Sequence, residues 1–328
     1  DGIRDKISLF CDVPRHAVIP LPTVDNVYEV PLILEDAGLG DTMLESLGLE
    51  FRSRDLDHWR KLVDRMKEPK EKVPIVVVGK YTDLPDSYIS VKEALFHAAL
   101  FHSRDIDISW VHSEEIERLG PEELLASACG IVVPGGFGPR GIEGMVQTAK
   151  YARENGVPYL GLCLGMQTMV VEYARDVLHL DGANSTEFDP ETLHPVIALM
   201  PDQQGLIEMG GTMRLGLYPC RLVDNSRAAR AYGEAVVLER HRHRYEFIND
   251  YLESLAEAGL RPSGISPDGS LVEISELTDH PFMMGVQFHP EFLSRPERPH
   301  PLFREFLAVA KEMIREGGQH PLPLNDGQ

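Results

Sequence analysis

The sequence of residues 157–165 is Val-Pro-Tyr-Leu-Gly-Leu-Cys-Leu-Gly, which predicts a buried strand, a sharp turn at Cys163 and a helix that begins at Leu164. Glycine at positions 161 and 165 lets this turn close tightly, because a Cβ atom at either position would clash. The sulfur then lies at the amino end of the helix Leu164–Arg175, where the helix dipole favours a thiolate. This stretch therefore predicts both an α/β fold and a nucleophile.

The segments around this stretch alternate between apolar strands and helices. The predicted strands are residues 75–79, 106–111, 131–133 and 157–162, and the predicted helices are residues 87–101, 121–127, 141–154 and 164–175. Such alternation is typical of an α/β fold with a mostly parallel central sheet and helices on both faces. The loops that follow the strands, including the loop that starts at Pro134, then lie at the edge where open α/β sheets bind ligands.

The segment 190–280 predicts shorter strands and one helix. The strands are residues 196–199, 214–218, 235–239 and 271–274, and the helix lies near residues 248–258. We expect these strands to extend the edge of the sheet by antiparallel pairing. Residues 282–288 predict a core strand that ends just before His289. A closing helix at residues 301–315 and a disordered tail at residues 317–328 follow.

A histidine and a carboxylate follow that core strand, in the sequence Gln287-Phe-His-Pro-Glu291. His289 and Glu291 are two residues apart, so on an extended chain they point the same way. A lone histidine is more often a hydrogen-bonded structural residue, and a lone cysteine is more often a small buried hydrophobe. Cysteine, base and base-orienting acid are the three parts of a nucleophilic acyl-transfer site. The combination predicts a Cys163–His289–Glu291 triad.

A glycine-rich loop, Gly135-Gly-Phe-Gly138, follows the strand at residues 131–133. Its backbone N–H groups can face a developing oxyanion, although a plain strand-to-helix turn has the same composition. It lacks the lysine of a phosphate-binding P-loop, so an ATP site is not predicted here.

The run Glu239–Glu246 is the dense basic segment of an acidic chain. If the run is extended, Arg240, Arg242 and Arg244 share a face. They either capture a small anion or form a solvated edge strand whose charges block pairing. The His-x-His within the run has no matching ligands nearby, so no metal site is predicted.

Composition limits the class of protein. The chain has 328 residues, of which 43% are hydrophobic, and a net charge of −20, which argues against nucleic acid and anionic membranes as partners. Its four cysteines form no C-x-x-C pair, as is typical of a reduced cytoplasmic protein. The sequence has no apolar run of membrane-spanning length and no signal peptide.

Residues 1–55 form a poor domain by themselves. Helical patterns occur at residues 1–10 and 39–49, with a proline-rich piece between them, and residues 54–68 predict an amphipathic helix. Pro69-Lys-Glu-Lys then predicts a linker. The chain opens at Asp1 without an initiator methionine, so we expect it to be the rear part of a longer protein.

Together these motifs resemble the class I, or triad, glutamine amidotransferases, and among them the CTP synthase family. The resemblance rests on residues 78–81, 84–88, 134–141, 184–188, 240–246 and 287–291, and extends to residues 7–14 and 24–31. It implies a flavodoxin-like three-layer fold. It also implies that residues 1–53 are the end of a synthetase domain and linker, residues 54–72 a linker helix, and residues 73–316 the amidotransferase domain.

The resemblance implies roles for the site residues. Cys163 would attack the side-chain amide of L-glutamine and release ammonia, with His289 and Glu291 completing the triad. The backbone around Gly136 and Leu164 would form the oxyanion hole.

The same resemblance implies two further sets of residues. Gln167, Glu187 and Arg244 would bind glutamine, with Arg244 on its α-carboxylate and Glu187 on its α-ammonium. The residues near the region where GTP acts as activator would be Phe137, Arg140 and Arg242.

The whole enzyme of this family converts UTP to CTP with ATP, Mg²⁺ and glutamine, and forms a homotetramer. Its ATP, Mg²⁺ and UTP sites would lie on the synthetase domain, which receives the ammonia. The chain itself has no P-loop, so we expect it to use no cofactor and at most to hydrolyse glutamine. Two alternatives are a stand-alone γ-glutamyl hydrolase of the same fold and a non-catalytic regulatory or assembly module.

Overall fold

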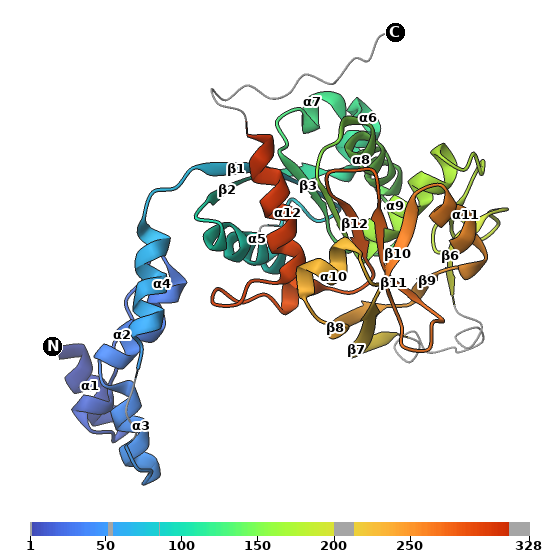
Figure 1. Ribbon diagram of the computed structural model, residues 1–328. Helices are drawn as coiled ribbons and strands as arrows, with labels where there is room; N and C mark the ends of the chain where they lie inside the picture. The colour runs from blue at the N-terminus through green and yellow to red at the C-terminus, as the bar shows by residue number, and fades with distance from the viewer. Residues whose placement is uncertain (1, 52–54, 85, 200–212, 315–328) are drawn as a thin grey trace. The chain divides into compact units, whose positions relative to one another are not determined.

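A computed structural model describes residues 2–51, 55–84, 86–199 and 213–314 of the chain (Figure 1). The chain divides into two compact units, Asp1–Pro69 and Lys70–Gln328. The predicted tail at residues 317–328, the start of the predicted helix at Arg54, and Pro85 of the motif at residues 84–88 lie outside the described residues.

The first unit is helical. Its elements are α1 (Gly2–Cys11), η1 (Arg15–Ala17), η2 (Val27–Glu29), α2 (Val30–Asp36), α3 (Leu39–Leu47) and α4 (Asp57–Lys67). The predicted helices at residues 1–10 and 39–49 are confirmed, whereas α2 was not predicted. In α4, Leu62 and Val63 are buried and Trp59 donates a hydrogen bond to the carbonyl oxygen of Tyr28 at 2.8 Å. Trp59 of the apolar stripe of α4 thus contacts η2 within this unit.

The second unit is built on a nine-stranded sheet. Five neighbouring strands are parallel: β2 (Asp105–His112), β1 (Lys72–Gly79), β3 (Gly130–Val133), β4 (Tyr159–Leu162) and β12 (Met283–Val286). Four antiparallel strands continue the sheet: β11 (Val272–Leu277), β10 (Leu260–Ile265), β7 (Arg214–Leu222) and β8 (Val236–His243). The predicted parallel core and its antiparallel extension are both confirmed.

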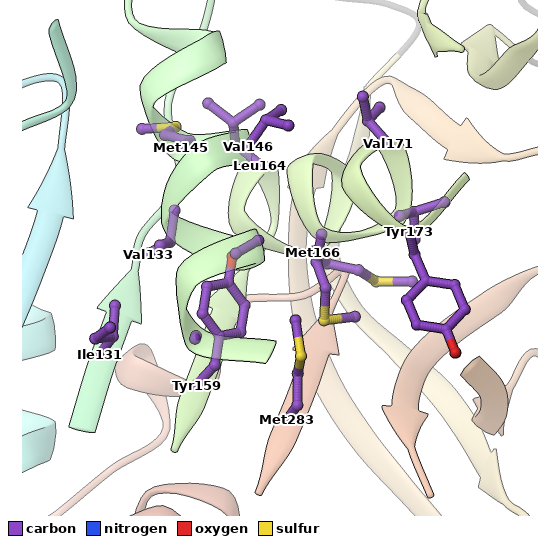
Figure 2. Packing of buried hydrophobic residues seen from close by; sticks show 14 of the residues in the cluster. Ile131, Val133, Met145, Val146, Tyr159, Leu164, Met166, Val171, Tyr173 and Met283 are labelled. Atoms are coloured by element: carbon purple, nitrogen blue, oxygen red, sulfur yellow. The ribbon is translucent and has the colours of Figure 1, made fainter. Parts of the chain in front are cut away.

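Helices cover both faces of the parallel strands (Figure 1). One face packs against α8 (Ile142–Asn155) and α9 (Leu164–Asp176), and the other against α5 (Ile89–Phe101) and α12 (Pro301–Ala310). Side chains alternate between the two cores along each strand, as the pleat requires. Ile131 and Val133 of β3 enter the α8–α9 core, shown in Figure 2, and Val132 enters the other. Within the described ranges, no helix has the length and apolar character needed to cross a bilayer.

Several predictions of secondary structure need correction. The strand predicted at residues 196–199 does not join the main sheet, because β6 (Pro195–Leu199) pairs instead with β5 (Asn184–Ser185) and β9 (Tyr245–Phe247) in a separate three-stranded sheet. The helix predicted at residues 248–258 is a 3-10 turn followed by α11 (Leu252–Glu257).

Other helices differ from prediction in length or were missed. The helix predicted at residues 121–127 is only α7 (Glu122–Leu125), and the closing helix ends at Ala310, with a 3-10 turn at Lys311–Met313. Helix α6 (Ser113–Leu119) was missed, because its sequence holds only two large apolar residues. The short helix α10 (Arg227–Tyr232) was also missed.

Candidate active site

The turn at Cys163 has the strained geometry that its flanking glycines predict. Cys163 lies between β4 and α9 with φ 52° and ψ −99°, a positive φ that few non-glycine residues adopt. A Cβ atom on Gly165 would lie 2.0 Å from the carbonyl oxygen of Val133, and one on Gly161 would lie 2.6 Å from the backbone of Gly165. The N–H of Cys163 donates to the Val286 carbonyl at 2.7 Å, which fixes the turn to β12.

The predicted base and its partner form a buried pair. Nδ1 of His289 lies 2.8 Å from Oε1 of Glu291, which lies in a short 3-10 turn, Pro290–Phe292, after β12. The N–H of His289 donates to the Arg240 carbonyl at 2.8 Å, so the residue is also held by β8. A Cβ atom placed on Gly135 would lie 2.9 Å from Cε1 of His289 and 3.7 Å from Cβ of Cys163. The base and the cysteine therefore flank the same point of the glycine-rich loop.

Electrostatics favour a charged imidazole. Burial lowers the pKa of His289, but attraction to Glu291 and Cys163 outweighs it and raises the pKa to about 11. By contrast, burial raises the pKa of the Cys129 and Cys220 thiols. His289 is therefore protonated at neutral pH.

The glycine-rich loop lies against the start of α9. A Cβ atom on Gly136 would be 3.1 Å from Cδ2 of Leu164, so the two residues are neighbours. Leu164 opens α9, where backbone N–H groups have no acceptor within the helix. The N–H of Gly138 donates to Oε1 of Glu187 at 2.9 Å. Backbone donors of the loop and of the helix thus meet beside Cys163.

A cavity of about 300 Å³ opens next to the cysteine. Its lining residues are Gly136, Phe137, Cys163, Gln167, Glu187, Met213, His243, Arg244 and Tyr245. Nε2 of Gln167 donates to the Tyr245 carbonyl at 3.3 Å and to Oε1 of Gln287 at 3.2 Å. Nε2 of Gln287 in turn lies 3.6 Å from the sulfur of Cys163. The structure thus brings together Cys163 and every residue predicted to bind glutamine, with Leu164 adjoining Gly136.

The three residues predicted near a GTP effector line two different cavities. The guanidinium of Arg242 lies 5.8 Å from the ring centroid of Phe137, and both line a cavity of about 160 Å³ that also reaches Cys163. Arg140 lines a different cavity of about 490 Å³, where it donates to Glu114 at 3.0 Å. Its guanidinium also donates to the carbonyl oxygen of Lys80 at 2.9 Å, so Arg140 remains connected to the residue that contacts the glycine-rich loop.

The arginine run divides between the edge of the sheet and the cavity. Arg240 and Arg242 share the exposed face of β8, the last strand of the sheet, which fits a charged edge strand. Arg244 lies beyond the end of β8 and lines the cavity instead. The expectation that all three arginines share a face is therefore wrong for Arg244.

A buried charged cluster behind the cavity was not predicted. Arg214 donates to Glu273 at 2.8 Å and to Glu246 at 3.3 Å, and all three side chains are buried or nearly so. Nδ1 of His241 lies 2.8 Å from Nε2 of His243, which lines the cavity. Burial, with a smaller contribution from neighbouring positive charges, lowers the pKa values of both imidazoles and keeps them neutral. The alternating sequence of β8 indicated that some of its polar residues are buried. It gave no indication of the residues near them on β7 and β11, which are Arg214 and Glu273.

Comparison with known proteins agrees with this geometry. The family model for class-I glutamine amidotransferases matches residues 83–309, and the model for the CTP synthase N-terminus matches residues 1–49. The chain belongs to the class-I glutamine amidotransferases of the CTP synthase type. This confirms the resemblance and the α/β fold class inferred from the sequence.

Individual relatives within the CTP synthase family are close. CTP synthase of Dehalococcoides mccartyi is 60% identical over 325 residues, which are 99% of this chain and 60% of that protein. CTP synthase of Roseiflexus castenholzii is 61% identical over 325 residues, 99% of this chain and 59% of that protein. The chain thus spans about 60% of the length of these relatives.

A solved structure matches most of the chain. It is the glutaminase domain of Trypanosoma brucei CTPS with bound acivicin. The TM-score is 0.69 and the identity 40%, and the match covers 73% of this chain and 94% of that one.

Proposed function

We propose that this chain is the glutaminase part of a CTP synthase and hydrolyses L-glutamine to glutamate and ammonia. The observation that carries the proposal is the cavity of about 300 Å³, which has Cys163 in its wall together with the carboxylate of Glu187 and the guanidinium of Arg244. An amino acid presents one ammonium and one carboxylate, so these two side chains match its two charges. The γ-amide then faces the sulfur.

The chemistry follows from the site. The thiolate of Cys163 adds to the amide carbon, and the N–H groups of Gly136 and Leu164 hold the resulting oxyanion. The imidazolium of His289 gives its proton to the leaving nitrogen, so ammonia departs and a glutamyl thioester remains. The neutral imidazole then takes a proton from water, the hydroxide attacks the thioester, and glutamate leaves as thiolate and imidazolium return. Glu291 holds the imidazole in orientation throughout.

The wider role extends the proposal. In the whole enzyme, a synthetase domain with ATP and Mg²⁺ sites would use the ammonia to convert UTP to CTP, in a cytoplasmic homotetramer with GTP as activator. Phe137 and Arg242 then lie where an effector could reach the loop beside Cys163. We expect this chain alone to make no CTP from UTP, ATP and ammonium.

The direct test is intact-mass labelling with a diazoketone analogue of glutamine. Because Cys11 is exposed, the test uses a Cys11→Ser background, in which Cys129 and Cys220 are buried controls. We expect one adduct, which is blocked by free glutamine and lost in Cys163→Ala. Acivicin, the compound bound to the glutaminase domain of the Trypanosoma brucei relative, is the second probe.

Other outcomes would favour the alternatives. An adduct that glutamine does not block, with hydrolysis of γ-glutamyl peptides but not of glutamine, would favour a γ-glutamyl hydrolase. The match of residues 1–49 to the CTP synthase N-terminus argues against that alternative. If Cys163 is labelled no faster than Cys129 and Cys220, the result would favour a non-catalytic module.

A further inference from the structure

We infer that Lys80 is a positioning residue that holds the glycine-rich loop in the conformation needed to stabilise the oxyanion. The inference rests on the glutaminase function proposed above. Lys80 directly follows β1 and is 2% exposed, although its side chain ends in an ammonium group. A buried ammonium is costly unless it is paired, so its partners indicate its role.

The partners of Lys80 are the carbonyl groups of the loop itself. Its Nζ donates to the carbonyl oxygen of Phe137 at 3.3 Å and also to that of Gly138. The stem of the side chain lies beneath Gly136, because a Cβ atom there would be 3.2 Å from Cδ of Lys80. In a trans peptide unit, the C=O and the N–H point in opposite directions. A carbonyl that points toward Lys80 therefore turns the N–H of the same peptide unit away from Lys80. The ammonium therefore fixes the direction of the Phe137–Gly138 peptide, which lies one residue beyond Gly136 in the same loop.

The loop is held from its opposite side by the substrate-binding carboxylate. The N–H of Gly138 donates to Glu187 at 2.9 Å, and the carbonyl of Phe137, which belongs to the same peptide unit, accepts from Lys80 at 3.3 Å. The Nζ of Lys80 also lies 5.6 Å from the ring centroid of Phe188, the residue after Glu187. Lys80 and Glu187 thus hold one peptide unit between them. The group that would receive the α-ammonium of glutamine is thereby connected to the loop that would receive the oxyanion.

The charge on Lys80 changes in an accessible pH range. Burial lowers the pKa of Lys80 to about 8. Glu187, Glu117 and Glu114 raise it, and Arg140 lowers it further. Above pH 8 the amine is neutral and donates weaker hydrogen bonds to the two carbonyls. His289, with its pKa near 11, does not titrate in this range.

The test compares Lys80→Met with Lys150→Met, which removes the exposed lysine paired with Asp176 on the α8–α9 surface. The ligand is the aldehyde analogue of glutamine, which forms a tetrahedral adduct with Cys163 and places its oxygen in the oxyanion hole. We expect Lys80→Met to weaken binding of the aldehyde by about 30-fold. This loss is smaller than the one expected when a direct donor of the oxyanion hole is removed. Glutamine binding, measured by calorimetry in a Cys163→Ala background, is expected to change less than about threefold, since Lys80 acts only on the tetrahedral state.

A second measurement keeps the test valid if Lys80→Met does not fold. The glutaminase kcat of the unmodified chain should fall with a midpoint near pH 8, and Lys80→Arg should move that fall to higher pH, because arginine does not lose its proton. A flat kcat from pH 7 to pH 9.5, or equal weakening of the aldehyde and of glutamine, would overturn the inference. Failure of the unmodified chain to bind either ligand would overturn the proposed function as well.

Discussion

In the parallel half of the sheet, β3 and β4 bury apolar side chains or glycine at every position, whereas in the antiparallel half β8 alternates exposed residues with the buried Glu239, His241 and His243. The parallel half places backbone groups: the cysteine turn and the glycine-rich loop are fixed by close packing. The antiparallel half places charged side chains, which buried ion pairs hold. The two halves therefore contribute to one site by different physical means, and they should fail differently when altered.

The largest expected effect tests close packing. Gly161→Ala in β4 places a methyl group 2.6 Å from backbone atoms that cannot move, and should cost about 5 kcal/mol in the free energy of unfolding. Gly264→Ala in β10 meets the side chains of Ile274 and Cys220 at 2.6 and 2.7 Å, which can shift, and should cost about 2 kcal/mol. Urea denaturation measures both variants. Equal losses of stability in the two variants would contradict the proposed difference between the two halves of the sheet.

The next effect tests the buried charges. Arg214→Met leaves Glu273 without its partner, and should cost about 3 kcal/mol of stability. The matched control is Arg153→Met, which breaks the buried pair with Glu172 between α8 and α9 and should cost about as much. Only Arg214→Met should also raise the KM for glutamine, by about tenfold, because its cluster supports the segment that holds Arg244. A KM that rises equally in both would show that stability alone is responsible.

A smaller effect lies at the junction of the two halves. Gln287→Leu removes the side chain that lies 3.6 Å from the Cys163 sulfur, and should slow alkylation of that thiol about tenfold. Gln147→Leu on α8 is the control. The measurement is the rate at which iodoacetamide labels Cys163 at pH 7 in the two variants. An unchanged rate in Gln287→Leu would mean that Gln287 does not influence the sulfur.

The smallest effect is a change in pH dependence. Burial, with the nearby Glu273, raises the pKa of Glu246 to about 8 against the opposing Arg214, while the unfolded chain loses this proton near its ordinary value of 4.5. The stability that this proton contributes is complete below pH 4.5 and is lost as pH rises through 8. Glu246→Gln should therefore reduce the fall in unfolding free energy between pH 5 and pH 8.5 by at least about 1 kcal/mol. The control is Glu253→Gln, a change at an exposed position of α11, which should leave the fall in unfolding free energy unchanged.

The same contrast explains what could be predicted from the sequence. Apolar runs and glycines are local signals, so the parallel strands, the cysteine turn and the His289–Glu291 pair were all evident. Lys80 had a signal too, because it follows a buried strand just as Cys163 does, but its loop partners are 57 and 58 positions away.

The antiparallel half was harder to predict because its pattern is polar and its contacts are distant. Arg214 meets Glu273 across 59 positions, and nothing near either residue signals the other. The strand at residues 196–199 was recognised but assigned to the wrong sheet, since its partner β9 follows 46 positions later. Arg140 was grouped with Phe137 and Arg242 by resemblance, and its contact with Glu114 across 26 positions had no signal in the sequence.

The position of β12 has a consequence for synthesis on the ribosome. This strand lies between β4 and β11, yet it is the last strand of the sheet to be made. Until residue 286 has left the exit tunnel, β4 and β11 each present an unpaired edge, and the nascent chain has its cysteine without its histidine. The reactive thiol therefore gains its base only when translation of this unit is almost complete, so incomplete chains cannot release ammonia.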